Sequence, residues 1–249
     1  MTLRRADAGA VVLAGGGSRR MGRPKALLDW HGSTLVERVA GLLARVAAPV
    51  VIVAAPGQQL PDVPGAETAV DANPGRGPLE GIAAGLRALQ GRCDRAFVAA
   101  TDLPLMHPAF ASAVLDALEE GDAAAPESGG RVHPLAAAYR ISRLELAEHL
   151  LAAGELRASA LAQGSGTRVL PAAELPHPES LRNVNTPDDY RTLLGLPEPM
   201  VVVDGAKWRA ATLGRLQEQL GRSAVLSLDG LRVDHPTTPL AEGDELTTA

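Results

Sequence analysis

Short apolar runs that alternate with stretches of helical periodicity constrain this chain most. Every position of the clearest run, Val50–Val53, is apolar, which is typical of a strand covered on both faces in a parallel sheet. Across residues 34–47, apolar positions recur at a spacing close to 3.6, with Ser33 as the expected N-cap of a helix. Strands that alternate with such helices indicate βαβ units. We therefore expect an α/β fold with a doubly wound, mainly parallel sheet that binds its ligand beyond the carboxyl ends of the strands.

The same alternation sets the elements expected in the first 195 residues. Strands are expected at 10–14, 49–54, 66–71, 95–102, 122–126 and 134–140, and extended segments at 167–171 and 180–185. Helices are expected at 34–47, 79–89, 108–119 and 142–153. A later helix is expected to begin with Thr186 as N-cap and Pro187 at its first position.

The pattern breaks at "LLGLPEPM", where Pro197 and Pro199 bracket a glutamate and predict a linker. Beyond it, "MVVVDG" predicts a strand and a turn, and "TLGRLQEQLG" predicts a helix capped by Thr212. "AVLSLDGLRVD" predicts a hairpin that turns at residues 229–230, and "GDEL" leads into a last edge strand. We therefore expect two domains, 1–197 and 200–249, the second of them a small α+β unit.

Composition excludes several classes of protein. Aromatic residues make up 2% of the chain and the net charge is -5, so neither base-stacking platforms nor a footprint for duplex nucleic acid is expected. The single Cys93 excludes an internal disulfide, and no two histidines have the spacing of a helical metal site. The chain has no apolar run long enough for a membrane span and no signal-peptide pattern. We expect a cytoplasmic protein with no nucleic-acid or membrane partner.

Positive charge is concentrated at the start of the chain. Residues 1–30 have a surplus of four positive charges, although the chain as a whole is acidic. This surplus favours an anionic ligand, with a solvated basic face as the alternative.

The basic residues surround a glycine cluster in "AVVLAGGGSRRMGRPKALL", directly after a strand-like run. A G-x-G-x-x-G dinucleotide fingerprint that starts at Gly15 would need glycine at Arg20, and a Walker loop would need Lys followed by Ser or Thr at Arg23-Pro24. Both motifs therefore fail. What remains is a loop of exposed backbone N–H groups and several cations, Lys25 among them, which suits a polyphosphate.

The loop "LAGGGSRRMGRPKALL" resembles the signature of MobA-like nucleotidyltransferases, the family of molybdenum cofactor guanylyltransferases. Four later segments resemble family segments in order and spacing: "GPLEGI", "ATDLPLM", "HPLAAAYR" and "NVNTPDD". The resemblance covers residues 9–195 and implies a Rossmann-like nucleotidyltransferase fold. It implies an enzyme that transfers GMP from GTP to the terminal phosphate of Mo-molybdopterin, with Mg²⁺ as cofactor, giving molybdopterin guanine dinucleotide and pyrophosphate.

The resemblance also implies which residues form the site. The catalytic residues would be Lys25, Arg20 and Asp102, with Asp102 as the metal ligand. The nucleotide would be bound by Leu13, Ala14, Gly15, Gly16, Lys25, Asp71, Gly77, Gly81 and Asp102. The acceptor would be bound by Asn183 and Asn185.

These residue types suit nucleotidyl transfer, in which the protein mainly positions groups and offsets charge. Lys25 and Arg20 can neutralise the triphosphate and the departing pyrophosphate. Asp102 ends an expected strand and is a suitable ligand for Mg²⁺, which favours one or two carboxylates plus phosphate oxygens. Each acid also has a structural alternative, because Asp102 can cap a helix before a proline and Asp71 can stabilise a turn. His133 is either a residue of the site or a satisfied histidine near a strand edge, and Arg131 and Arg140 could reach an anionic acceptor or be ordinary surface arginines.

One departure from the family pattern concerns the base. The guanylyltransferase pattern often has asparagine at the end of the second strand, where this chain has Ala54 or Ala55. The departure weakens the case for guanine and leaves a CTP-dependent molybdopterin cytidylyltransferase as an alternative, whereas the "LAGG" opening favours guanine by resemblance. A sugar-1-phosphate nucleotidyltransferase is a further alternative, although those chains are commonly longer.

Residues 200–249 resemble the β-grasp sulfur carriers of molybdopterin and thiamin synthesis through "TTPLAEGDEL". Those carriers need a terminal Gly-Gly, and this sequence has Thr247-Thr248-Ala249 instead, which puts a carrier role in doubt. A docking module for apo-molybdoenzymes or other cofactor-synthesis proteins is one interpretation, and a stabilising appendage is the other. With such a module the whole chain could also be a non-catalytic protein that binds and delivers the finished cofactor.

Overall fold

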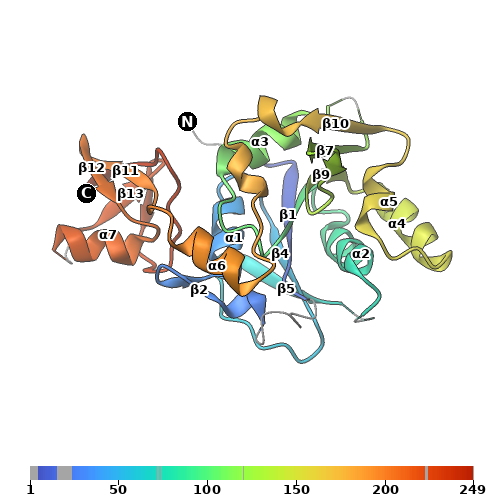
Figure 1. Ribbon diagram of the computed structural model, residues 1–249, viewed down its shortest axis with the longest axis horizontal. Coiled ribbons are helices and arrows are strands. Elements are labelled where there is room, and N and C mark those ends of the chain that lie inside the picture. The colour runs from blue at the N-terminus through green and yellow to red at the C-terminus, as the bar shows by residue number, and fades with distance from the viewer. Residues whose placement is uncertain are drawn as a thin grey trace.

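The computed structural model describes residues 5–15, 24–71, 73, 75–119, 121–221 and 224–248. Its main sheet has eight strands in the order β10-β7-β9-β6-β1-β4-β5, with β8 paired to β7 (Figure 1). The strands are β1 (Ala8–Leu13), β4 (Val50–Ala54), β5 (Ala66–Val70), β6 (Arg95–Ala100), β7 (Ala123–Ser128), β8 (Arg131–Val132), β9 (Ala136–Arg140) and β10 (Thr167–Pro171).

Most strand pairs in this sheet are parallel. β1 pairs in parallel with both β4 and β6, β4 with β5, and β10 with β7. β9 runs antiparallel to β6 and β7, and the short β8 antiparallel to β7. The chain leaves β1 toward β4 on one side and reaches β6 on the other, so the strand order reverses beside β1. The prediction of a doubly wound, mainly parallel sheet is confirmed.

Helices cover both faces of the sheet. α1 (Leu35–Leu43) and α3 (Pro108–Asp116) share one apolar cluster with Ala10 and Val12 of β1. α2 (Pro78–Leu89), α4 (Arg143–Ala152) and α5 (Ala158–Ala162) share a second cluster with Val11 and Leu13. Alternate residues of β1 therefore face opposite layers, as the period of a strand requires, and the continuous apolar run is explained.

The N-cap of α1 differs from the prediction. Thr34, not Ser33, caps the helix, because its side chain accepts from the N–H of Glu37 while the Glu37 carboxylate accepts from the N–H of Thr34. This capping box needs an acid three residues after the cap, and only Thr34 has one. Ser33 instead belongs to a short hairpin of β2 (Asp29–Trp30) and β3 (Ser33–Thr34), which the periodicity did not predict.

The extended segment expected at 180–185 is wrong for its first two residues. Residues 178–181 form a 3₁₀ turn, η3 (Pro178–Leu181), and the chain after it bonds to the segment that follows β6 through the N–H of Val184 and the carbonyl of Asp102 (2.9 Å). A single bond cannot make a ladder. The helix that follows, α6 (Pro187–Leu194), begins as predicted, with Thr186 as N-cap in a capping box with Asp189.

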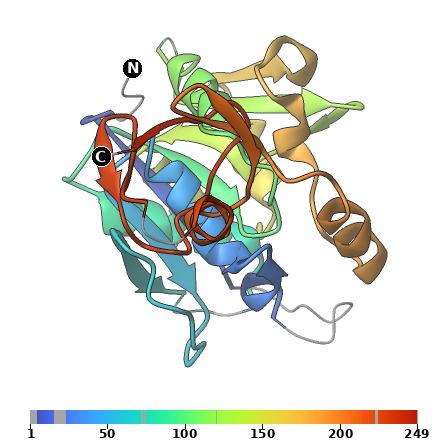
Figure 2. The same cartoon turned by 90° about the vertical axis from the view of Figure 1, so that its left-hand side faces the viewer.

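The remaining strands, which we call the C-terminal unit (residues 200–248), form a separate five-stranded sheet in the order β12-β11-β15-β13-β14 (Figures 1 and 2). Its elements are β11 (Met200–Val203), β12 (Ala206–Arg209), α7 (Leu213–Leu220), β13 (Leu226–Leu228), β14 (Leu231–Val233) and β15 (Glu245–Thr248). The unit has its own apolar core of Val201, Val203, Ala210, Leu213, Leu216, Leu226, Leu228, Leu240 and Leu246.

Two predictions for this unit are confirmed and one is wrong. Thr212 caps α7, and the hairpin turns at Asp229 and Gly230, both with positive φ. The last strand is not an edge strand: β15 lies in the middle of the sheet, parallel to β11 and antiparallel to β13. β12 was not predicted. The likeness to β-grasp carriers and the division into domains stay predictions.

None of the helices in the described residues is both long enough and apolar enough to cross a membrane.

Candidate active site

A cavity of about 420 Å³ opens where β1, β4, β5 and β6 end. Because these strands are parallel, their carboxyl ends meet at one edge, beside the point where the strand order reverses. The lining residues are Leu13, Ala14, Gly15, Lys25, Val53, Ala55, Asp71, Gly75, Gly77, Pro78, Gly81, Ala100, Thr101, Asp102 and Leu135. The structure thus brings together every residue expected to bind nucleotide except Gly16, which, like Arg20, lies outside the described residues.

Three side chains from distant parts of the chain meet in what we call the lysine cluster. The Lys25 ammonium donates to Asp102 Oδ2 and to Asn185 Oδ1, each at 3.0 Å. The side chains of Lys25 and Asp102 are each 20% exposed, so the ion pair is half-buried and still open to a ligand. Such a group can exchange one partner for a phosphate oxygen without leaving a buried charge uncompensated.

Local structure places each member of the lysine cluster. Lys25 opens a 3₁₀ turn, η1 (Lys25–Leu27), and Asp102 follows β6 by two residues. Asn185 precedes α6, and its N–H donates to the carboxylate of Asp189. The bond from the Thr186 side chain, with those from the N–H groups of Asn185 and Thr186, lowers the pKa of Asp189. Thr186 therefore acts as the helix cap that its motif indicated.

A small apolar cluster, here called the apolar support, lies under these segments and was not predicted. Its members are Leu28, Trp30, Leu35, Val184 and Leu193, with Leu105 packed against them. Leu28 and Leu105 each follow a member of the lysine cluster by three residues, and Val184 precedes one directly. The support therefore fixes the three segments relative to one another.

The two asparagines expected to bind the acceptor are in different environments. Asn185 joins the lysine cluster, whereas Asn183 is exposed and does not line the cavity. The residue between them is buried and faces the apolar support. Adjacent side chains of an extended segment point to opposite sides, so two asparagines separated by one buried residue share the solvent side.

Asp71 stabilises a turn at the rim of the cavity. Its N–H donates to the carbonyl of Ala54, which extends the pairing of β5 with β4, and its carboxylate accepts from the N–H of Asn73 (2.9 Å). The side chain therefore stabilises a turn and lines the cavity at once.

The two glycines of "GPLEG" serve close packing. Gly77 has φ +79, and a Cβ there would lie 2.6 Å from the backbone oxygen of Leu156. A Cβ on Gly81 would lie 3.2 Å from the side chain of Leu13. Glycine at these positions lets α2 begin at the mouth of the cavity and lie close to β1.

Gln58 is a residue of this region that the sequence did not reveal. Its amide nitrogen donates to the carbonyl of Ala14 and its amide oxygen accepts from the N–H of Ala55, both at 3.0 Å. The side chain thus bridges the ends of β1 and β4. Gln58 lies in the loop after β4, three residues beyond Ala55, and only the fold shows that its amide points back toward the strand ends.

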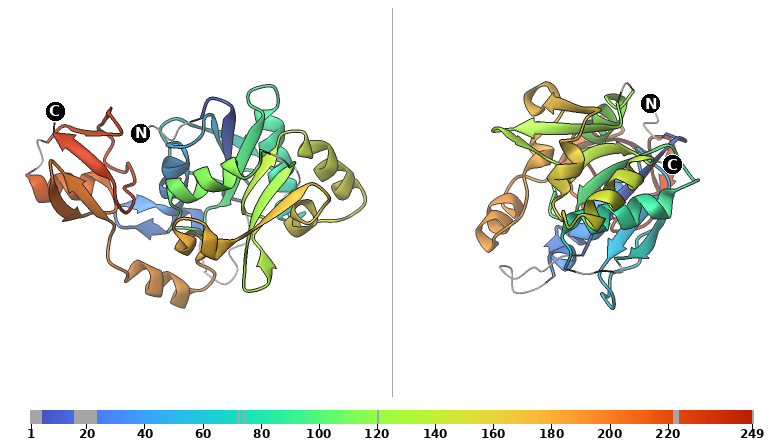
Figure 3. Two further views of the ribbon diagram at one scale, coloured as in Figure 1. Left: turned by 90° about the horizontal axis from the view of Figure 1, so that it is seen from above. Right: turned by 90° about the vertical axis from the view of Figure 1, so that its right-hand side faces the viewer.

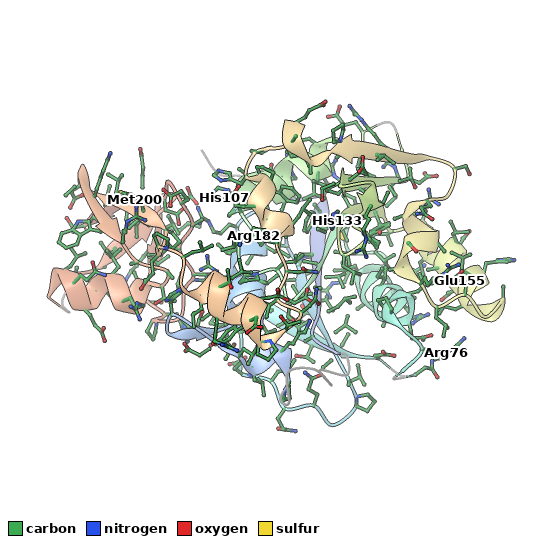
Figure 4. The ribbon with its side chains drawn as sticks, viewed as in Figure 1. Arg76, His107, His133, Glu155, Arg182 and Met200 are labelled. Atoms are coloured by element: carbon green, nitrogen blue, oxygen red, sulfur yellow. The ribbon has the colours of Figure 1, made fainter. Side chains whose placement is uncertain are left out.

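His133 and Arg140 do not join the lysine cluster. His133 bonds to the hydroxyl of Ser128 (2.8 Å), and burial, with the nearby Arg131, lowers its pKa (Figure 4). Arg140 donates to the backbone oxygens of Gly121 and Glu119. The bonds given for both residues are to neighbouring groups of the protein, as for ordinary residues near a strand edge.

The donor set fits a metal that arrives with a nucleotide. No group of three or more His, Cys, Asp or Glu in the described part of the chain could hold an ion on its own. Asp102 offers one carboxylate at the mouth of the cavity, and Mg²⁺ ordinarily takes its other ligands from phosphate and water. Asp102 is the residue that would hold it.

Comparison with known proteins agrees with this geometry. The family of MobA-like NTP transferase domains matches residues 10–168. A probable molybdenum cofactor guanylyltransferase of Mycobacterium avium is 40% identical over 187 residues, covering 74% of this chain and 93% of the relative. One of Mycobacterium tuberculosis is 41% identical over 181 residues, covering 71% and 88%.

A solved structure shows the same fold. Molybdopterin-guanine dinucleotide biosynthesis protein A from Archaeoglobus fulgidus superimposes with a TM-score of 0.62 at 25% identity, covering 74% of this chain and 95% of that one. The chain therefore belongs to the MobA-like NTP transferase family and is a nucleotidyltransferase.

Proposed function

We propose that the protein transfers GMP from GTP to the terminal phosphate of Mo-molybdopterin. An oxygen of that phosphate attacks the α-phosphorus, a new O–P bond forms, and the bond from the α-phosphorus to the bridging oxygen breaks as pyrophosphate leaves. The products are molybdopterin guanine dinucleotide and pyrophosphate. The observation that carries the proposal is the lysine cluster at the mouth of the strand-end cavity, in a chain whose relatives are named as guanylyltransferases of this cofactor.

Each member of the cluster has a role in this reaction. Lys25 neutralises the triphosphate and the leaving pyrophosphate, and Arg20 adds a second cation from the glycine loop. Asp102 holds Mg²⁺, which supplies charge stabilisation on the phosphate oxygens when bound. Asn185 orients Lys25, and with Asn183 it positions the acceptor. These roles are supported for Lys25, Asp102 and Asn185 by the bonds of Lys25 to the other two side chains.

The base and ribose occupy the part of the cavity between β1, β4 and α2. Leu13, Ala14 and Gly15 line the space for the nucleotide, and Gly16, which lies outside the described residues, is assigned to it by the family resemblance alone. Asp71 accepts from the nucleotide, and Gly77 and Gly81 keep α2 close. CTP remains the second candidate, because the end of β4 offers Ala55 where guanylyltransferases often have asparagine. We place the reaction in the cytoplasm, in a domain formed by residues 1–197, with residues 200–249 as a second domain.

A single incubation tests the proposal. The protein is mixed with Mg²⁺, Mo-molybdopterin and either GTP or CTP, and pyrophosphate and the dinucleotide product are measured. We expect pyrophosphate with GTP only when the acceptor is present. A preference for CTP would replace the guanylyltransferase with a cytidylyltransferase. Binding of the cofactor without any turnover would support a delivery protein instead.

A further inference from the structure

One face of α1 contacts the C-terminal unit. Arg38, Gly41 and Arg45 recur at spacings of three and four residues, from the middle of the helix to just past its end, so they share one face. The opposite face carries Val36 and Val39 into the core beneath the sheet. Figures 2 and 3 show the C-terminal unit on this side of α1. We call this contact surface the seam.

Arg38 is the centre of the seam. Its side chain is 3% exposed, and burial lowers its pKa to about 10, so it is charged at neutral pH. Its guanidinium donates to the carbonyl of Pro104 in the first domain and to those of Ala211 and Leu240 in the C-terminal unit. No ion pair of Arg38 with a carboxylate occurs among the described residues. Separation of the two parts would take away two of the three acceptors of Arg38 and open the contact surface that buries it.

Shape and charge continue the seam along α1. A Cβ on Gly41 would lie 2.7 Å from the ring of Pro239, so the helix and the C-terminal unit approach as closely as glycine allows. Arg45 donates to both oxygens of Asp244 (2.9 and 2.7 Å), whose side chain is 5% exposed. Beside them, His107 bonds to the carbonyl of Glu242 (2.9 Å). A C-terminal unit that moved independently on a flexible linker would not need such buried contacts.

The C-terminal unit also contacts the hairpin of residues 29–34. The Thr212 hydroxyl donates to the carbonyl of His31 at the hairpin turn (3.3 Å). The carboxylate of Glu198, in the linker just before the unit, lies 3.6 Å from the His31 ring. Arg215 fixes that carboxylate at 2.6 Å. Arg38 stands 6.0 Å from the ring of Trp30 in the same hairpin.

This hairpin is the continuation of the segment that carries Lys25. Lys25–Leu27 form η1, Leu28 bonds back to the carbonyl of Lys25 (3.0 Å), and Trp30 belongs to the apolar support of the lysine cluster. Trp30 therefore touches the seam on one side and the support of the site on the other. A contiguous set of packed groups runs from the C-terminal unit to Lys25.

We propose that the C-terminal unit is a fixed positioning element of the active site, which holds the 29–34 hairpin and thereby keeps Lys25 on Asp102 and Asn185. The positioning residues are Thr212 in the unit and Arg38 in α1. The inference rests on the proposed function for its catalytic readout, but the hairpin contacts can be tested without any reaction. It differs from a swinging carrier and from a free docking module, both of which need the unit to move independently.

The test uses the full chain and a size-complementation pair outside the site. Gly41→Ala forces Pro239 away without weakening α1, because alanine is the better helix former, and Pro239→Ala added to it removes the ring that clashes. Thr212→Val and Thr212→Ser form a second pair, since only serine keeps the hydroxyl. The readouts are hydrogen exchange of residues 25–35 and the kcat and KM for GTP of pyrophosphate release in the presence of Mg²⁺ and Mo-molybdopterin.

We expect Gly41→Ala and Thr212→Val to speed exchange in 25–35 about tenfold and to lower kcat/KM about tenfold, mainly through KM. Pro239→Ala should restore both values in the Gly41→Ala background, and Thr212→Ser should remain near wild type. Faster exchange confined to 200–248, with 25–35 and kcat/KM unchanged, would overturn the proposal. If the wild type releases no pyrophosphate, the proposed function fails while the exchange arm still decides the positioning role.

Discussion

The lysine cluster and the seam are each centred on one cation, and they hold it in opposite ways. Lys25 contacts the side chains of Asp102 and Asn185 and is 20% exposed. Arg38 donates to backbone carbonyls and is 3% exposed. Side-chain partners can turn toward a ligand, whereas carbonyls of packed segments cannot. The first arrangement suits a site that changes partners during a reaction, and the second suits a permanent joint.

Removing the acid of the lysine cluster should have the largest effect. Asp102→Ala deletes the expected metal ligand and should lower Mg²⁺-dependent pyrophosphate release roughly 10³-fold, with little change in thermal stability. Asp102→Asn is the matched control for shape and should be nearly as inactive. Activity within a few-fold of wild type in both variants would take Asp102 out of the mechanism.

The lysine itself comes next. Lys25→Ala should reduce kcat/KM for GTP by roughly 10²-fold, because one charge on the triphosphate would be left uncompensated. Lys25→Arg keeps the charge but not the compact ammonium that fits between Asp102 and Asn185, so only partial rescue is expected. Full activity of the alanine variant would show that the cluster is a structural ion pair.

At the seam the expected loss is in stability. Arg38→Met removes the donor to the carbonyls of Pro104 and Leu240 and one of the two donors to that of Ala211, and it should lower the free energy of unfolding by about 3 kcal/mol. For a chain of this size the melting temperature should fall by roughly 6–12 °C. Thermal unfolding by circular dichroism measures it. A change under 2 °C would mean that Arg38 does not hold the two parts together.

Gln58→Ala should have a smaller effect, confined to the nucleotide. The substitution unlinks the ends of β1 and β4 and should raise KM for GTP about fivefold with kcat nearly constant. Gln58→Glu keeps the acceptor for the N–H of Ala55 and loses the donor to Ala14, so it separates the two bonds. An unchanged KM in both variants would leave Gln58 without a role in binding.

The smallest effect is a pH dependence at the seam. Burial lowers the pKa of His107 below its ordinary 6.5. The unfolded chain therefore binds more protons just below pH 6.5, so this contribution to stability is complete above that pH and is lost as pH falls through the lower, folded pKa. The melting temperature should drop between pH 7.5 and 5.5, and less so in His107→Asn. An identical drop in that variant would assign the effect to other groups.

The sequence revealed the site better than the seam, for a physical reason. Lys25, Asp102 and Asn185 each follow or precede a strand or helix end, where local patterns indicate both the element and its polar residue. The parallel sheet then brings such ends to one edge. Nothing local marks Gly41 as a contact for Pro239 or Arg38 as a donor to Ala211, because these pairs exist only after two separate sheets have packed.

The elements that were predicted wrongly also differ in whether the local sequence marks them. Thr34 rather than Ser33 caps α1 because Glu37 stands three residues after Thr34. This spacing is the local signature of a capping box and is visible in the sequence. The central place of β15 depends on its pairing with β11 and β13, more than ten residues away in the chain. Gln58 is intermediate, since its loop was predicted and the direction of its amide was not.

The most direct test of the central claim follows the α-phosphorus. GTP labelled there is incubated with the protein, Mg²⁺ and Mo-molybdopterin, and the labelled species are separated. The account predicts that the label moves into the molybdopterin dinucleotide in step with pyrophosphate release, and that Asp102→Ala stops both. Label that stays in GTP, or appears only in free GMP or GDP, would contradict nucleotidyl transfer at this site.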